Sequence, residues 1–165
     1  MNMFKTEGYP NIRIKAEKLG FNVPKSVWIL PMGFESLQDS NNILYSADYD
    51  TIIKLFRSND IQCSSLDSIP KLKNNSFELF ALPLIAFTYD YIKENPQVII
   101  ESLKLLADLF RKHSKPYSKS ESPQVKVSII KEERKGSFKK YSYQGPESSF
   151  EKFIDYVKSE EKNGE

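Results

Sequence analysis

The chain has very little of the residues that most catalytic and metal sites use. One cysteine, Cys63, and one histidine, His113, occur among 165 residues. A single cysteine excludes an internal disulfide and agrees with a reducing compartment. One residue of each type cannot supply the four ligands of a tetrahedral zinc site. A catalytic thiol needs a base and an orienting group, so we interpret Cys63 as a structural thiol and His113 as a cation at a helix end.

Glycine is also scarce, and this excludes several phosphate-binding motifs. The six glycines are scattered, so neither a Gly-x-Gly-x-x-Gly loop nor a Gly-Lys-Ser/Thr loop is present. The Gly-x-Ser-x-Gly turn of many hydrolases is missing as well, and the acidic residues lack the spacing of a calcium loop. We therefore predict no cofactor, no metal and no enzymatic activity. Because two carboxylates can meet from anywhere in a chain, an enzyme of unrecognised type is kept as an alternative.

Long apolar runs are absent too. The longest apolar stretch, residues 79–92, is interrupted by Pro83 and Asp90, and it is shorter than the roughly 20 residues that a membrane-spanning helix needs. The first residues show no basic segment followed by an apolar run, so no secretory signal is predicted. We expect a cytoplasmic protein that does not cross a membrane.

Aromatic residues and an uneven distribution of charge are what the chain does have. Its 11 Phe and 9 Tyr can fill a dense core in a single domain of this length. The net charge of +2 hides an asymmetry, because residues 111–140 hold ten Lys or Arg against three Glu, a local net of +7. A segregated charge of this kind bears on partners rather than on the fold.

The first half of the chain predicts short elements. Residues 11–15 alternate like a strand while 16–19 end like a helix, and periodicity does not decide between them. Residues 26–30 predict a buried strand, and 43–45 predict a second short one. A helix is expected over 48–59, where apolar residues recur at helical spacing.

The middle of the chain contains a polar stretch and then apolar segments. Residues 62–76 read as a long loop and as a sub-boundary within the domain. Residues 77–81 fit a strand or the lead-in to a helix, and we expect a helix over 83–93. Asn95 and Pro96 are typical of the start of another helix, over 96–112. Its apolar stripe is wide, which implies burial on more than one side or a partner.

The last third has the clearest pattern. Residues 125–129 alternate, 132–136 form a turn, and 137–143 return, which predicts a β-hairpin. A capping box at Ser148 and Glu151 then opens an amphipathic helix over 148–158. Residues 159–165 are polar and are expected to form a disordered tail. Together these patterns predict an α+β fold, a single domain in which a small mixed sheet including the C-terminal hairpin packs against amphipathic helices.

The hairpin is the candidate interaction site, because basic residues concentrate on it. The candidate residues are Lys126, Lys131, Arg134, Lys135, Lys139, Lys140 and Tyr141. Basic residues interleaved with aromatics can hold single-stranded nucleic acid, which gives the alternative function. Equally, lysines can protect an edge hairpin from aggregation while its aromatics face the core.

The order of helix, basic helix end, Pro/Ser spacer, hairpin and helix resembles a known family. The resemblance lies within residues 80–158. The residues that show it are the helical run Val98–Lys112, the strands Val125–Ile130 and Phe138–Tyr143, and the helix Ser149–Val157. The pattern resembles the C-terminal part of effector-associated constant component modules of bacterial conflict systems. That resemblance implies a non-enzymatic accessory module encoded beside effectors, and it transfers no site residues.

We therefore expect a non-enzymatic protein-interaction module, acting as an adaptor, a regulator or an immunity-type inhibitor in a bacterial conflict or defence system. The basic hairpin or the wide apolar helix would form the interface. The expected partner is another protein, such as an effector or toxin, and the basic charge favours an acidic surface on it. Nucleic-acid binding is the alternative, and self-association through the apolar helix stays open.

Overall fold

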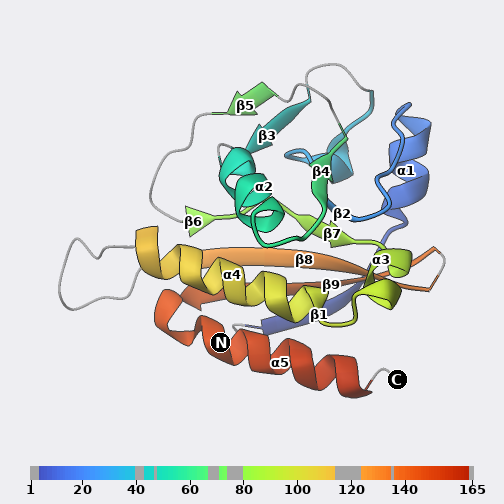
Figure 1. The fold of residues 1–165 in the computed structure, drawn as a ribbon. Coiled ribbons are helices and arrows are strands. Elements are labelled where there is room, and N and C mark those ends of the chain that lie inside the picture. The colour runs from blue at the N-terminus through green and yellow to red at the C-terminus, as the bar shows by residue number, and fades with distance from the viewer. Residues whose placement is uncertain are drawn as a thin grey trace.

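The computed structural model describes residues 4–39, 43–46, 48–66, 71–73, 80–113, 124–134 and 136–163. The fold is α+β, as predicted: a mixed sheet with helices on both of its faces (Figure 1). The strands of this sheet are β1 (Phe4–Tyr9), β2 (Val27–Ile29), β4 (Cys63–Ser65), β6 (Phe80–Ala81), β7 (Ile85–Phe87), β8 (Gln124–Arg134) and β9 (Ser137–Pro146). A separate parallel pair consists of β3 (Leu44–Ser46) and β5 (Lys71–Lys73). The helices are α1 (Ile12–Lys18), α2 (Tyr49–Arg57), α3 (Tyr89–Glu94), α4 (Val98–His113) and α5 (Phe150–Asn163), with single turns at Phe34–Ser36 and Glu147–Ser149.

The strand order across the sheet is β1-β9-β8-β7-β2-β4, and β6 pairs separately with β8. The hairpin β8–β9 is antiparallel and confirms the prediction, with Val127 opposite Tyr143 and an irregularity between Glu132 and Arg134. β1 extends the hairpin on its outer side, also antiparallel. β7 is parallel to β8 and antiparallel to β2, whereas β4 is parallel to β2, with α2 lying between them in the chain.

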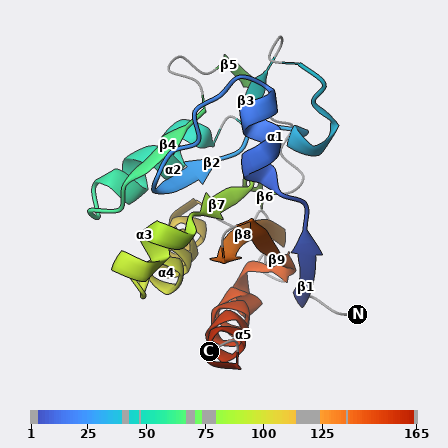
Figure 2. The ribbon, with the colours of Figure 1, turned by 90° about the vertical axis from the view of Figure 1, so that its right-hand side faces the viewer.

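Strand alternation divides the core between the two faces of the sheet. On β8, Val127 and Ile129 point into the larger core with α2, α4 and α5. Ile130 points the other way, into a second core that includes Trp28 and the α1 residue Ile12. Figure 2 shows α1 on one side of the sheet and α4 and α5 on the other. The sheet is thus covered fully on one face, whereas α1, the loop after it and the turn at Phe34–Ser36 cover part of the other face.

The wide apolar stripe of α4 is buried inside the chain itself. Leu103, Leu106 and Phe110 are 0% exposed, and Ile100 and Leu109 on the flanks are also buried. α4 contacts α5 on one side and α2 on the other. Burial on more than one side therefore accounts for the stripe, and α4 does not offer an apolar interface.

Several expected elements differ in the structure. The helix expected over 83–93 is wrong in its first half, because 85–87 form β7 and α3 begins only at Tyr89. A short buried strand and a buried helical segment carry the same continuous apolar run, so periodicity could not separate them. Residues 12–18 are helical, with the Asn11 side chain accepting a hydrogen bond from the Ile14 amide. β1 was not anticipated at all.

The prediction of a disordered tail is also wrong for residues 159–163, which continue α5. Residues 164–165 lie outside the described residues. Glu161 holds this last turn against the sheet through an ion pair with Lys131. The expectation of a long loop over 62–76 is wrong in part, because the described residues of this stretch include β4 and β5. Strands from before and after this stretch belong to one sheet, so it does not divide the sheet into two units.

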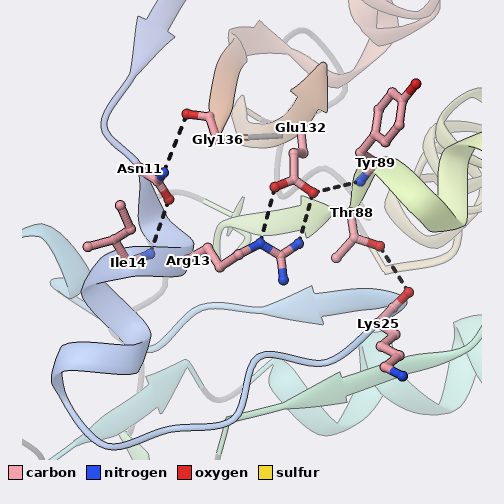
Figure 3. Close-up of polar contacts among 8 residues, drawn as sticks. All are labelled: Asn11, Arg13, Ile14, Lys25, Thr88, Tyr89, Glu132 and Gly136. Carbon is pink, nitrogen blue, oxygen red and sulfur yellow. Dashed lines mark hydrogen bonds and ion pairs between the residues drawn. The ribbon is translucent and has the colours of Figure 1, made fainter. Parts of the chain in front are cut away.

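A polar cluster ties the start of the chain to the hairpin (Figure 3). The guanidinium of Arg13 donates to both carboxylate oxygens of Glu132, at 3.2 and 2.9 Å. The same carboxylate accepts a hydrogen bond of 2.9 Å from the amide of Tyr89, the first residue of α3. Thr88, the residue before α3, donates its hydroxyl to the carbonyl of Lys25. Three elements distant in sequence, α1, β8 and α3, are thus joined through one buried carboxylate.

Candidate interaction surface

The predicted basic residues of the hairpin lie on two opposite faces of the sheet. Lys131 and Lys139 are cross-strand partners in the same alternation as Ile129 and Tyr141, so they lie on the α5 side. Lys126 lies in the other alternation of β8, and Lys140 lies opposite Ile130 on the α1 side. Because neighbouring residues of a strand point to opposite faces, a run of lysines along a hairpin cannot form one surface.

The two lysines on the α5 side are neutralised by carboxylates. Lys131 Nζ lies 3.5 Å from Glu161, and Lys139 Nζ lies 2.8 Å from Glu133. Each of these side chains is about one-fifth to one-third exposed. Their charge serves the attachment of α5 and the end of the hairpin, and little of it is available to a partner.

The opposite face carries the remaining basic charge of the hairpin, and we call it the open face: Lys5 and Glu7 of β1, Lys140, Ser142 and Gln144 of β9, and Lys126 of β8, with the buried Ser128 between them. The register places these residues side by side, with Lys5 opposite Ser142, Ser142 opposite Ser128, and Gln144 opposite Lys126. Lys126 is exposed, and within the described part of the chain it makes no ion pair. Three lysines against one glutamate give the face a net charge of +2.

Two contacts anchor the α1 end of the open face. The ammonium of Lys140 lies 5.4 Å from the ring centre of Tyr9, a cation–π contact. The Tyr9 hydroxyl donates to the Glu35 carboxylate. Burial, together with the carboxylates of Glu35 and Glu7, raises the pKa of Tyr9 well above its ordinary value. Tyr9 is therefore a neutral, fixed support for Lys140.

The aromatic residues of the hairpin are not surface residues. Tyr141 is 1% exposed, so its assignment to the interaction site is wrong. Phe138 and Tyr143 are buried as well, the first under α1 and the second against α5. Burial, with the charges of Glu133 and Glu161 added to it, raises the pKa of Tyr141. Of the remaining predicted residues, Arg134 is exposed near the turn, and Lys135 lies outside the described residues.

Two adjoining pockets lie elsewhere, at the loop before β4, and no sequence pattern indicated them. The first has a volume of about 510 Å³ and is lined by Ser26, Arg57, Asp60, Ile61, Gln62, Cys63 and Ser64. The second, of about 760 Å³, shares Asp60 and Gln62 with it and is otherwise lined by Lys25, Asp90, Tyr91, Lys93, Glu94 and Asn95.

The pocket chemistry does not favour a nucleophile. Burial raises the pKa of the Cys63 thiol to about 12, although the nearby charge of Arg57 acts to lower it. Arg57 donates its Nε–H to the carbonyl of Cys63 at 3.0 Å, so its cation is directed at the backbone. A thiol with this pKa is protonated at neutral pH and reacts slowly. The side chain of His113 lies outside the described part of the structure.

Within the described ranges, no group of three or more His, Cys, Asp or Glu side chains is arranged to hold a metal ion. Nor does any helix in those ranges have both the length and the apolar character needed to cross a membrane. β1 supplies Lys5 and Glu7, which sequence reasoning missed; the alternation of Phe4, Lys5, Thr6 and Glu7 was the available signal. Compared with protein-family models, with curated proteins and with solved structures, the chain matches none.

Proposed function

We propose that the protein is a non-enzymatic protein-interaction module that binds an acidic surface of another protein through its open face. The observation that carries the proposal is the position of Lys126 and Lys140. Both lie on the sheet face that α4 and α5 leave uncovered, whereas Lys131 and Lys139 on the other face are paired with carboxylates. Polar neighbours such as Ser142 and Gln144 add hydrogen-bonding groups between the cations, as is usual for a protein-binding rim.

The alternative, binding of single-stranded nucleic acid, has less support. Such sites combine a basic groove with aromatic rings on which bases stack. Here the hairpin rings of Phe138, Tyr141 and Tyr143 are buried in the two cores. The half-buried ring of Tyr9 lies beneath Lys140. A net charge of +2 without a stacking platform favours a protein patch over a phosphate backbone.

The cellular context comes from the resemblance of residues 80–158 to effector-associated constant component modules. Its pattern of elements corresponds to α4, β8, β9 and α5 in the fold. We accordingly propose a cytoplasmic adaptor, regulator or immunity-type inhibitor whose partner is an effector or toxin of a bacterial conflict system. The protonated thiol of Cys63 agrees with a module that performs no covalent chemistry.

The test compares three proteins as bait in the native host: the wild type, K126E/K140E, and the matched control K54E/K104E. Lys54 and Lys104 are exposed on α2 and α4, so the control carries the same charge change away from the open face. We expect an acidic protein partner to be retained by the wild type and the control and lost by K126E/K140E. Retention by all three would overturn the proposal, and so would salt-sensitive binding of a labelled oligonucleotide that K126E/K140E alone abolishes.

A further inference from the structure

The outer strand β1 has a free edge and a self-complementary charge pattern. Within the described residues it hydrogen-bonds to β9 alone, and it ends the strand order of the sheet. Figure 2 shows β1 at the outer margin of the molecule, and no labelled element lies beyond it. Six residues of extended backbone, Phe4–Tyr9, thus present unpaired amide and carbonyl groups, which is a template for a further strand. Natural edge strands are usually shortened, bulged or covered, and β1 shows a regular register throughout.

We infer that β1 pairs with β1 of a second copy of this chain, antiparallel and centred on Thr6. A two-fold axis perpendicular to the sheet at Thr6 places Lys5 of each copy opposite Glu7 of the other. Both pairs lie on the open face, where the side chains of Lys5 and Glu7 are 68% and 38% exposed. Within one copy the Lys5 ammonium already lies 3.4 Å from the Glu7 carboxylate, so pairing across the axis joins two such ion pairs into a cluster of four alternating charges. Opposite charges directly across an antiparallel ladder stabilise the pairing, and like charges destabilise it. Phe4 falls opposite Gly8, and the face of the sheet above Gly8 has room for a neighbouring side chain, because an added Cβ there meets no atom within 4 Å.

The helix beneath β1 fits the same axis. Tyr156 of α5 lies under β1, with its ring stacked on Phe4 at 5.3 Å between centres and its hydroxyl hydrogen-bonded to Thr6. An axis through Thr6 therefore passes beside Tyr156. Lys152 and Glu160 lie one turn before and one turn after Tyr156, on the same stripe of α5. Rotation about the axis brings Lys152 of one copy beside Glu160 of the other, a second self-complementary pair.

The spacing of the layers agrees with this arrangement. Paired strands lie about 4.8 Å apart, so β1 is about 2.4 Å from the axis and β9 about 7 Å. α5 packs across both strands, since Phe153 contacts Phe4 of β1 and Tyr143 of β9. Two copies of α5 then lie about 10 Å apart, the ordinary distance between packed helices. The dimer continues the sheet across both copies and joins the two open faces into one surface.

Charge exchange tests the register. Analytical ultracentrifugation over a concentration series should show a dimer for the wild type, and K5E or E7K alone should raise the dimer Kd about tenfold or more, because each creates two like-charge pairs. The double variant K5E/E7K should restore the dimer, because it exchanges the partners without changing the pattern. An equimolar mixture of K5E and E7K, one of them isotope-labelled, should form a heterodimer in native mass spectrometry. In that mixed pair the K5E strand carries two acidic side chains, and each faces one of the two lysines of the E7K strand.

The control is K54E, which changes the charge equally on α2, far along the sheet from β1. It should dimerise like the wild type. Circular dichroism should show that every variant is folded. This check matters most for E7K, because Glu7 also lies opposite Lys140 of β9 and the change places two lysines across the strands. A wild-type chain that stays monomeric at all concentrations would overturn the inference. A dimer whose Kd is unchanged in K5E and in E7K would also overturn it. So would a mixture of K5E and E7K that forms no heterodimer. This test measures self-association of the purified chain, whereas the bait experiment measures retention of a partner by K126E/K140E, so either proposal can fail without the other.

Discussion

Arg13 and Glu132 form a two-point ion pair across 119 residues of sequence, and the carboxylate is only 3% exposed. Arg13 is the second residue of α1, and Glu132 lies near the end of β8. Because the same carboxylate also receives the first amide of α3, a single side chain satisfies donors from two helices. Geometry of this kind is required when a charge is buried, since an unpaired carboxylate inside a protein is strongly unfavourable.

We expect R13A to lower the free energy of unfolding by about 2–4 kcal/mol, because within the described residues it leaves the buried Glu132 carboxylate with the Tyr89 amide as its remaining donor. Chemical denaturation monitored by circular dichroism measures the change. The control K18A removes an exposed cation from the same helix and should change stability by less than about 0.5 kcal/mol. In the double variant R13A/E132A the losses should be less than additive, because the two residues act as one unit. Additive losses would show that the pair is not coupled.

The ion pair also illustrates what could not be predicted from the sequence. Glu132 falls in a stretch that reads as the turn of the hairpin, and its charge favours solvent. Its burial depends on α1 crossing over the end of β8, a contact that no local pattern encodes. The strands of the hairpin and the helices α2, α4 and α5 were predictable, because their apolar residues recur at the spacing of one buried face. β1 and β7 were not: the first is polar and at an edge, and the second is a short run that fits a helix equally well.

The candidate site was predictable in composition and wrong in geometry. Lysines and aromatics do concentrate on the hairpin, but strand alternation separates Lys126 and Lys140 from Lys131 and Lys139 and places Tyr141 in the core. The alternation of side chains along β8 and β9 could have shown which lysines share a face of the sheet. Which face is open could not be inferred, because that depends on where α5 returns to the sheet. The charge partners Glu133 and Glu161 belong to that same long-range packing.

Cys63 should be unreactive in the folded protein. Its thiol is buried, and its pKa is raised from 9.0 to about 12, so the thiolate is rare at pH 8. We expect alkylation by iodoacetamide at pH 8 to be slower than in denatured protein by about a hundredfold or more, detected by mass spectrometry. An alkylation rate equal to that of the denatured protein would contradict the burial of Cys63. Cys63 would then be a candidate nucleophile in the pocket that it lines.

The same thiol should make the protein less stable at high pH. In the unfolded chain it ionises near 9.0, whereas in the folded chain it keeps its proton until about 12. Between these values the unfolded state has lost the proton and the folded state has not, so the free energy of unfolding falls as pH rises from 9. Buried Tyr9 and Tyr141, whose pKa values are also raised, add to the fall above pH 10. Denaturant midpoints from pH 8 to 11 should therefore decline in the wild type and less steeply in C63A.

D60G should stabilise the protein. Asp60 has a φ of 60°, and it ends α2 in a Schellman motif, with the Ile61 amide bonded to the Phe56 carbonyl and the Asp60 amide to that of Arg57. Gly20 fills the equivalent position after α1, with a φ of 90°. Because glycine adopts this backbone conformation without a steric penalty, we expect D60G to gain about 0.5–1 kcal/mol, and G20A to lose about 1 kcal/mol. Thermal denaturation of the two variants measures both signs, and a destabilised D60G would mean that the Asp60 carboxylate has a role that outweighs its backbone strain.

S102A should also stabilise the protein, without altering its structure. Ser102 lies in the middle of α4, 1% exposed, and within the described residues its hydroxyl has no hydrogen-bond partner. A buried hydroxyl without a partner loses its hydration and gains nothing in return, and alanine also favours the helix more than serine does. We expect a gain of about 0.5–1.5 kcal/mol in the free energy of unfolding, measured by chemical denaturation. The neighbouring change L103A, which removes a fully buried side chain from the same helix, should instead lose about 2–5 kcal/mol. If S102A also loses stability, the hydroxyl must have a partner in solution, most simply a main-chain carbonyl one turn earlier in α4.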